Sequence, residues 1–120
     1  MAGKYRGTGS VMKFDKKNAQ LRWYTRLDKL TQVNAIATVV DPREKYFFGC
    51  GQDNYADRDR NSRDNDAWIF RINDDGEMHW SLELSGRGPK ILTKGSDICT
   101  GVHYDSESQG IAAIIQTKSP

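Results

Sequence analysis

The richest concentration of residues able to do chemistry is an acidic segment in the middle of the chain. Within it, Asp57, Asp59 and Asn61 have the i, i+2, i+4 spacing of a calcium-binding loop, whose ligands are hard oxygen atoms. The rest of that loop pattern is missing, because Ser62 stands where the loop needs glycine and Trp68 stands where it needs glutamate. Three arginines also lie among the acidic residues. We therefore predict no metal site here and interpret the segment as a charged surface loop.

The other residue types that bind metals or carry out catalysis lack the spacing that their chemistry requires. The candidate zinc ligands are His79, His103, Cys50 and Cys99. No Cys-x-x-Cys or His-x₃₋₅-His spacing groups them. No Gly-x-Ser-x-Gly nucleophile elbow occurs, and Gly-Thr-Gly-Ser at residues 7–10 lacks the Gly-Lys-Ser/Thr of a phosphate-binding loop. We predict that the chain is not an enzyme and has no catalytic residues, no cofactor and no metal.

Neither the cysteines nor the apolar residues indicate export or a membrane. Two cysteines give no disulfide framework, so we expect two free, buried thiols. No apolar run approaches the ~20 residues that cross a bilayer. The first residues lead into no apolar stretch, and we expect no signal peptide. The chain is therefore predicted to be intracellular and cytoplasmic, with a large or cytoskeletal assembly as one setting in which it could act.

Charge is unevenly distributed, although the net charge is only +2. Residues 1–30 hold eight Lys/Arg against two Asp, whereas residues 53–77 hold seven Asp and one Glu against four Arg. Such asymmetry can steer a partner toward one side of a protein. We predict two interaction surfaces, the basic face and the acidic loop. The basic face is Lys16, Lys17, Arg22, Tyr24 and Arg26, and the acidic loop is Asp57, Asp59, Asp64 and Asp66.

Nucleic-acid binding is an alternative interpretation of the basic N-terminal third. Tyr5, Trp23 and Tyr24 are interleaved with lysine and arginine there, as in proteins that bind single strands by stacking. Trp23, however, falls on the apolar face of a strand, where packing in a core is the stronger expectation. We therefore expect a protein partner rather than nucleic acid.

The elements that must position these residues are strands, since helix signals are nearly absent. Apolar and polar residues alternate with a period of two, and clusters of glycine, asparagine and aspartate separate the runs. The predicted strands are 9–15, 19–27, 34–40, 45–50, 67–72, 77–84, 97–104 and 109–116. The chain is thus predicted to be all-β.

These strands recur as a repeat. Residues 11–23 and residues 68–80 each run from a strand through a polar turn to a strand that ends in tryptophan. The strand pair in residues 34–50 likewise matches the pair in residues 97–116. A unit that recurs in this way must stack on a copy of itself to bury its apolar face.

Alternation also predicts which residues of the tryptophan strands share a face. In one strand the shared face holds Leu21, Trp23, Thr25 and Leu27. In the other it holds Met78, Trp80, Leu82 and Leu84. The two sets match position by position, which supports the repeat.

The two turn-and-tryptophan segments resemble the tryptophan-docking motif of quinoprotein-like β-propellers. That motif runs roughly Ala-x-Asp-x-x-x-Gly-Lys-x-x-Trp. In the first copy Asp15 and Trp23 hold their places, whereas Lys13 stands at the alanine position and Ala19 at the glycine position. In the second copy residues 72–80 keep the Gly-to-Trp spacing, with a turn that is one residue shorter.

The resemblance implies an architecture and leaves the family's chemistry aside. In that family the segments are the third and fourth strands, C and D, of a four-stranded antiparallel blade, and the tryptophan packs between blades. This assigns Trp23 and Trp80 to structural docking. Family enzymes that oxidise alcohols hold a quinone and calcium and carry adjacent cysteines, which this chain lacks, so their activity is not transferred.

The strand order then becomes C-D-A-B-C-D-A-B. Residues 1–32 form half a blade with a basic N-terminus, residues 33–84 a complete blade, and residues 85–120 a second half blade. Propellers commonly have about four to eight blades, so this is an incomplete propeller unless other chains complete it. Open strand edges would remain at both ends. Further copies, another protein or the rest of a larger chain could complete it, and a small two-sheet sandwich is the remaining alternative.

We expect, in sum, a non-catalytic protein-interaction or scaffold module that acts in a larger assembly through exposed strand edges and charged faces. Its partner would be another protein or further copies of itself. The alternatives are a cofactor- or calcium-binding quinoprotein-type enzyme fragment and nucleic-acid binding through the basic N-terminal third.

Overall fold

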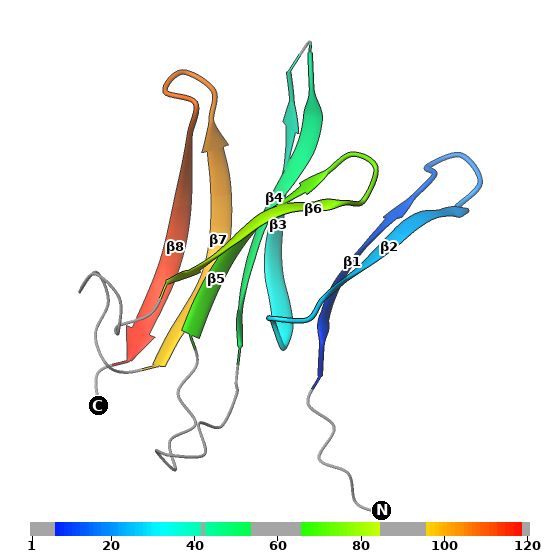
Figure 1. Ribbon diagram of the computed structural model, residues 1–120. Coiled ribbons are helices and arrows are strands. Elements are labelled where there is room, and N and C mark those ends of the chain that lie inside the picture. Colours follow the sequence, from blue (N-terminus) through cyan, green and yellow to red (C-terminus); the bar gives the residue numbers. More distant parts are fainter. Residues whose placement is uncertain (1–6, 42, 54–65, 85–95, 119–120) are drawn as a thin grey trace, which may run out of the picture.

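The structure is a computed structural model that describes residues 7–41, 43–53, 66–84 and 96–118 (Figure 1). Eight antiparallel strands and no helix occur in these residues. They are β1 (Gly9–Phe14), β2 (Leu21–Leu27), β3 (Gln32–Val40), β4 (Lys45–Asp53), β5 (Asp66–Asn73), β6 (Met78–Leu84), β7 (Ser96–Asp105) and β8 (Gly110–Lys118). The prediction of an all-β chain with antiparallel sheets is confirmed. Among the described residues no helix is long and apolar enough to cross a membrane.

The strands form three sheets that follow the chain in order. A β1–β2 hairpin comes first, then a four-stranded sheet in the order β3-β4-β5-β6, then a β7–β8 hairpin. Figure 1 shows the two hairpins on opposite sides of the four-stranded sheet. No closed propeller is present in the described residues, and the propeller arrangement stays a prediction.

Four hairpin turns within the described residues are each held by an aspartate whose carboxylate accepts a hydrogen bond from the backbone N–H two residues later. This local bond favours a turn over a continued strand, which is why the strands end there. The four aspartates are Asp15, Asp41, Asp75 and Asp105, with N···O distances of 2.8, 2.9, 3.0 and 3.1 Å.

One face of the four-stranded sheet is covered by the β1–β2 hairpin. Phe70 and Ile72 of β5 point to this side and are fully buried. They form one apolar cluster with Val11 and Leu27 of the hairpin and with Leu30, which follows β2. Packing the apolar faces of two sheets against each other removes both from water.

A glycine makes room for the Phe70 ring on this face of the sheet. Gly49 of β4 is the cross-strand partner of Phe70, and a Cβ atom built on it would collide with the phenyl ring. The missing side chain therefore gives the ring its space.

The other face is covered by the β7–β8 hairpin. Cys50, Ala67 and Cys99 form the buried centre of this second cluster, and Val102 and Ile115 of the hairpin pack around it. Further along the sheet, Phe48 of β4 stacks on Tyr104 of β7, with ring centroids 6.1 Å apart. The four-stranded sheet is thus the middle layer of three.

The two cysteines form a disulfide, so the prediction of two free thiols is wrong. Cys50 of β4 and Cys99 of β7 are fully buried, with Cα atoms 5.7 Å apart. The sequence hides this pair because its members lie 49 residues apart in strands of different sheets. Disulfides are rare in the cytosol, and the cytoplasmic prediction therefore loses the support that free thiols gave it.

The predicted shared faces of β2 and β6 are interrupted by β-bulges. The pairing register shifts between Lys13 and Phe14 in the first hairpin and between Arg71 and Ile72 in the four-stranded sheet. An extra residue in one strand moves the following side chains to the opposite face. Leu21 therefore points away from Trp23. Met78 likewise joins the β1–β2 side, whereas Trp80 contacts Phe48 on the β7–β8 side.

Breaking the disulfide should loosen the β7–β8 hairpin from the four-stranded sheet. A cross-link that closes a loop of this length restricts the unfolded chain, and its loss typically costs about 2–4 kcal/mol. We expect urea unfolding of the protein to shift to lower urea in the presence of a reductant. The Cys50→Ala/Cys99→Ala variant should already show the lower midpoint and should not respond to reductant. Equal midpoints with and without reductant in the unchanged protein would contradict a structural role for the disulfide.

Candidate functional site

The first hairpin is docked on the four-stranded sheet by Trp23 of β2. Its indole N–H donates a hydrogen bond to the backbone carbonyl of Asp74 in the β5–β6 turn, at 2.9 Å. The ring lies against Gly76, where an added Cβ would come within 2.8 Å of the indole. Gly76 has a φ of +91°, which glycine adopts without strain. Thr25 of the same strand donates to the Gly76 carbonyl, so two bonds fix one turn to one strand.

An ion pair reinforces this contact. The Lys13 ammonium of β1 bonds to the carboxylate of Asp74, which holds the pKa of that carboxyl below its ordinary value of 3.8. Lys13 lies directly opposite Trp23 in the hairpin, so the two side chains reach the turn together.

The β1–β2 hairpin has the same construction as the β5–β6 hairpin. In the first, Lys13 pairs with Trp23, and the register shifts immediately after Lys13. In the second, Arg71 pairs with Trp80, and the register shifts immediately after Arg71. The bulge therefore falls at the same place relative to the tryptophan in both. The two hairpins therefore share a backbone register as well as the turn-and-tryptophan sequence pattern, and the repeat itself stays a prediction.

The second tryptophan has no turn to dock on within the described residues. Trp80 is half-buried and lies 5.9 Å from the Phe48 ring, centroid to centroid. Among the described residues, its indole N–H has no hydrogen-bond acceptor. Trp23 and Trp80 occupy equivalent positions in their hairpins. Among the described residues, only Trp23 bonds to a turn of another sheet through its indole N–H.

The β7–β8 hairpin in turn matches the β3–β4 pair. A register shift leaves Asn34 unpaired in β3, and an equivalent shift leaves Thr100 unpaired in β7. Counting from these bulges, the pair Tyr104 with Ile111 corresponds to Thr38 with Phe47. The two hairpins at the ends of the chain thus correspond to the two halves of the four-stranded sheet.

Large apolar side chains remain exposed on particular faces. Eight such side chains in the described part of the chain are between 48% and 75% exposed. Four lie on the outer face of the β1–β2 hairpin, and one lies on the outer face of the β7–β8 hairpin. The other three lie on parts of the four-stranded sheet that the hairpins leave open. The four on the β1–β2 hairpin are Met12, Phe14, Leu21 and Tyr24, and the one on the β7–β8 hairpin is Ile114. The three on the four-stranded sheet are Leu82, Ile36 and Val40.

The predicted basic face lies on the β1–β2 hairpin. Lys16 and Lys17 are exposed in its turn, and Tyr24 is on its outer face. The Arg22 guanidinium bonds to Asp15 at 2.6 Å, and this bond holds the pKa of the Asp15 carboxyl below its usual value. Arg26 lies 4.0 Å from Asp28. Two of the four cations are therefore already paired with acids of the same hairpin.

Of the predicted acidic loop, only Asp66 belongs to the described residues. Asp57, Asp59 and Asp64 lie outside them, as does the calcium-like spacing around them. Asp66 is the first residue of β5 and pairs with Asp53, the last residue of β4.

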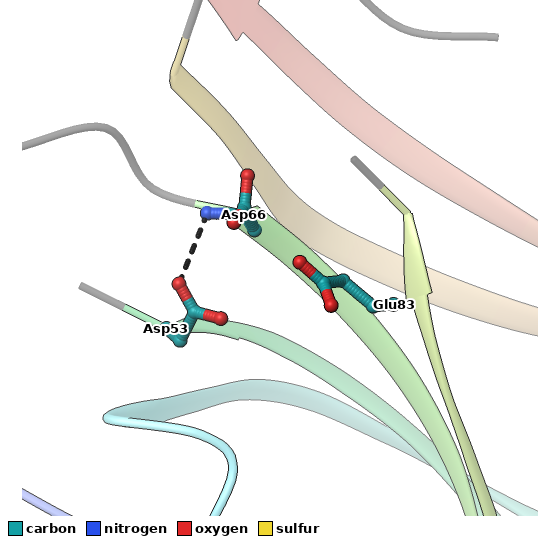
Figure 2. Close-up of side chains that lie close together, drawn as sticks. All are labelled: Asp53, Asp66 and Glu83. Carbon is teal, nitrogen blue, oxygen red and sulfur yellow. Dashed lines mark hydrogen bonds between the residues drawn. The ribbon is translucent and has the colours of Figure 1, made fainter. Parts of the chain in front are cut away.

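A carboxylate cluster that the sequence analysis missed lies at this end of the sheet. Figure 2 shows Asp53, Asp66 and Glu83, from β4, β5 and β6, with one oxygen of each within 4.8 Å of the others. Such oxygens are the ligands that calcium and magnesium prefer. Asp53 is buried, but its carboxylate already accepts hydrogen bonds from the Trp68 indole at 2.7 Å and from the Asp66 N–H at 3.4 Å. These donors account for its burial without a cation.

The cluster escaped sequence reasoning because its members come from three strands. Only the register brings them together, through the cross-strand pairs Asp53 with Asp66 and Trp68 with Glu83. No local spacing could have revealed it.

Comparison with known proteins does not extend these findings. No model of a known protein family matches the chain, and no curated protein sequence matches it significantly. The resemblance to quinoprotein-like propellers therefore stays a prediction based on the two turn-and-tryptophan segments.

The two tryptophans should respond differently to the same substitution. Trp→Phe removes the indole N–H and the same volume at either position, but only Trp23 loses a hydrogen bond, worth about 1 kcal/mol. We expect Trp23→Phe to lower the free energy of unfolding by about that much more than Trp80→Phe does. Urea unfolding at a protein concentration where the chain is monomeric measures the difference. Equal losses would contradict the docked geometry of Trp23.

The Lys13–Asp74 ion pair should make stability depend on pH in acid. Because the pKa of Asp74 is lower in the folded state, the pair stabilises the fold above the ordinary aspartate pKa and loses this effect as the pH falls through the folded-state pKa. We expect Lys13→Met to lower Tm at about pH 6 and to have a smaller effect at about pH 2.5. Lys16→Met, in the exposed turn, is the control. A Lys13→Met effect that is the same at both pH values would rule out the ionic contribution.

Proposed function

We propose that this chain is a non-catalytic protein-interaction module that works in a larger propeller-like assembly, through open strand edges and exposed apolar faces. The observation that carries the proposal is the position of the exposed apolar side chains. Every large one in the described residues lies on a face that a further stacked strand pair would cover. Scattered exposed apolar residues are ordinary, but residues gathered on one hairpin face are typical of an interaction surface.

The incomplete stacking supports this proposal. The four-stranded sheet has two strands stacked on each side, so part of each face has no covering layer among the described residues. Leu82 of β6 lies on the open part of one face and Ile36 of β3 on the open part of the other. Covering apolar surface is favourable by roughly 25 cal/mol per Å², and a partner that stacks there would gain this energy.

The strand edges add hydrogen bonds to the apolar contact. In the described residues, β1 is paired only with β2, and β8 only with β7. The unpaired N–H and C=O groups of such an edge accept an added strand from a partner. Backbone bonds would then supply part of the affinity, and the apolar side chains beside them the specificity.

Charge provides a way to guide the partner. The exposed Lys16 and Lys17 extend from the β1–β2 turn, next to the apolar outer face of the same hairpin. Positive charge at the rim of an interface speeds association with an acidic partner and matters less for the strength of the final complex. The basic face thus belongs to the rim of the proposed interface, and the apolar face to its centre.

Aspartate on the apolar faces should release the chain from its assembly. Phe14 and Ile114 are exposed, so Phe14→Asp and Ile114→Asp should leave the fold of the isolated chain intact. In cells that make the protein, we expect the tagged chain to elute at a mass well above its 13.6 kDa, and each variant to elute near that mass. Ser106→Asp, which adds the same charge to the exposed β7–β8 turn, is the matched control and should elute with the unchanged chain. Elution of the unchanged chain as a monomer, or of all four chains in the same complex, would overturn the proposal.

A further inference from the structure

We infer that the partner is a second copy of this chain, whose β8 pairs with β1 to complete a four-stranded sheet. The inference rests on the proposed function and names the occupant of its open edges. The sheet so formed would run β7-β8 from one copy and β1-β2 from the next, and it would repeat the β3-β4-β5-β6 sheet that each copy already contains.

The chain itself provides the template for this sheet. The β7–β8 hairpin has the register and bulge position of β3–β4, and the β1–β2 hairpin has those of β5–β6. The two halves found at the ends of the chain are therefore the two different halves of one sheet. Two identical halves could not complete it, but these two can.

The β4–β5 pairing predicts the register between copies. In that pairing, Phe48 lies opposite Arg71. Arg71 corresponds to Lys13 because each is the cross-strand partner of the tryptophan in its hairpin. Phe48 corresponds to Ala112 when β4 and β8 are aligned by the bulges in β3 and β7. Ala112 of one copy should therefore lie opposite Lys13 of the next. By the same rule, Ile114 should lie opposite Val11.

This sheet would cover the exposed apolar faces. In it, the outer face of the β1–β2 hairpin would turn toward the first copy's four-stranded sheet, on the side where Leu82 is open. The outer face of the β7–β8 hairpin, with Ile114, would turn toward the second copy's sheet, on the side where Ile36 is open. Each exposed hairpin face would thus pack on the open part of a four-stranded sheet, so that the same interface removes both apolar faces from water.

In this assembly, Trp80 would also have a turn on which to dock. Trp80 of one copy would face the β1–β2 turn of the next, as Trp23 faces the β5–β6 turn within one copy. Ala19 lies four residues before Trp23, as Gly76 lies four before Trp80, and both have a positive φ. Because a Cβ at Gly76 would come within 2.8 Å of the Trp23 indole, the Ala19 methyl group would require the Trp80 indole to lie farther from its turn.

The charges around this turn differ from those at the Trp23 contact, because Lys17 stands where the β5–β6 turn has Asp74. Arg71 takes the position of Lys13, but it already pairs with Glu44 at 3.5 Å and lies 3.9 Å from the Tyr46 ring. The β1–β2 turn therefore does not need to supply an acidic partner for it.

Each copy would add about two four-stranded sheets to the assembly. About two to four copies would therefore reach the size of common closed propellers, which have about four to eight blades.

Cysteine pairs across the new edge test both the partner and the register. We would mix chains that each carry one substitution, Val11→Cys or Lys13→Cys on β1 with Ile114→Cys or Ala112→Cys on β8, under mild oxidation. Matched partners lie directly opposite and meet the geometry of a disulfide. Mismatched partners lie two residues apart along the strand, about 7 Å, and do not. The native disulfide is fully buried and stays intact.

We expect disulfide-linked heterodimers from Val11→Cys with Ile114→Cys and from Lys13→Cys with Ala112→Cys, and several-fold less product from the two crossed mixtures. Because the chains are mixed single variants, each product joins two molecules. Equal yields in all four mixtures would overturn the register, and no product from a chain that light scattering finds monomeric would overturn the self-partner.

Failure of this inference can be told from failure of the proposed function. Two copies with different tags, made in the same cells, should be recovered in one complex. Suppose that each tag is recovered without the other, and that Ile114→Asp still dissociates the complex. The partner is then a different protein, and the proposal of an interaction module stands. If no complex forms at all, the proposed function fails as well.

Discussion

The structure depends on one constraint: a four-stranded sheet with apolar side chains on both faces has to be covered on both sides. The fully buried Phe70 and Ile72 point to one side, and Cys50 and Ala67 point to the other. A single hairpin cannot satisfy such a sheet, and the chain provides one hairpin for each face. Stacking of sheets, rather than pairing of strands, therefore joins the three parts of the molecule.

The two covering contacts use different chemistry. On one side Trp23 and Lys13 reach the β5–β6 turn, so the contact combines an indole, a backbone carbonyl and an ion pair. On the other side a disulfide and a stacked pair of aromatic rings hold β7 against β4. Both hairpins are narrower than the sheet beneath them. The apolar surface that remains open on each side is the physical basis of the assembly role proposed for this chain.

Prediction from the sequence succeeded where the determinants are local. Period-two alternation along the chain, together with the glycine, asparagine and aspartate clusters between the runs, was enough to predict strands at all eight places where the structure has them. It failed where one extra residue changes the face of a strand, since neither bulge leaves a mark in composition. Met78 was consequently placed beside Trp80, although it packs on the opposite side of the sheet. The carboxylates of Asp53 and Glu83 were missed for a similar reason, because they approach each other only through pairing in the sheet.

The sequence by itself determined that this is an antiparallel β protein, because period-two alternation and turn residues act over a few neighbouring positions. Only the tertiary structure decided which sheets face one another. It thereby joined Cys50 to Cys99, docked Trp23 on the β5–β6 turn and left Ile114 exposed. The physical reason is that stacking brings together side chains far apart in the chain. No short-range pattern encodes which two faces will meet, since any apolar face can lower its free energy against any other of suitable shape.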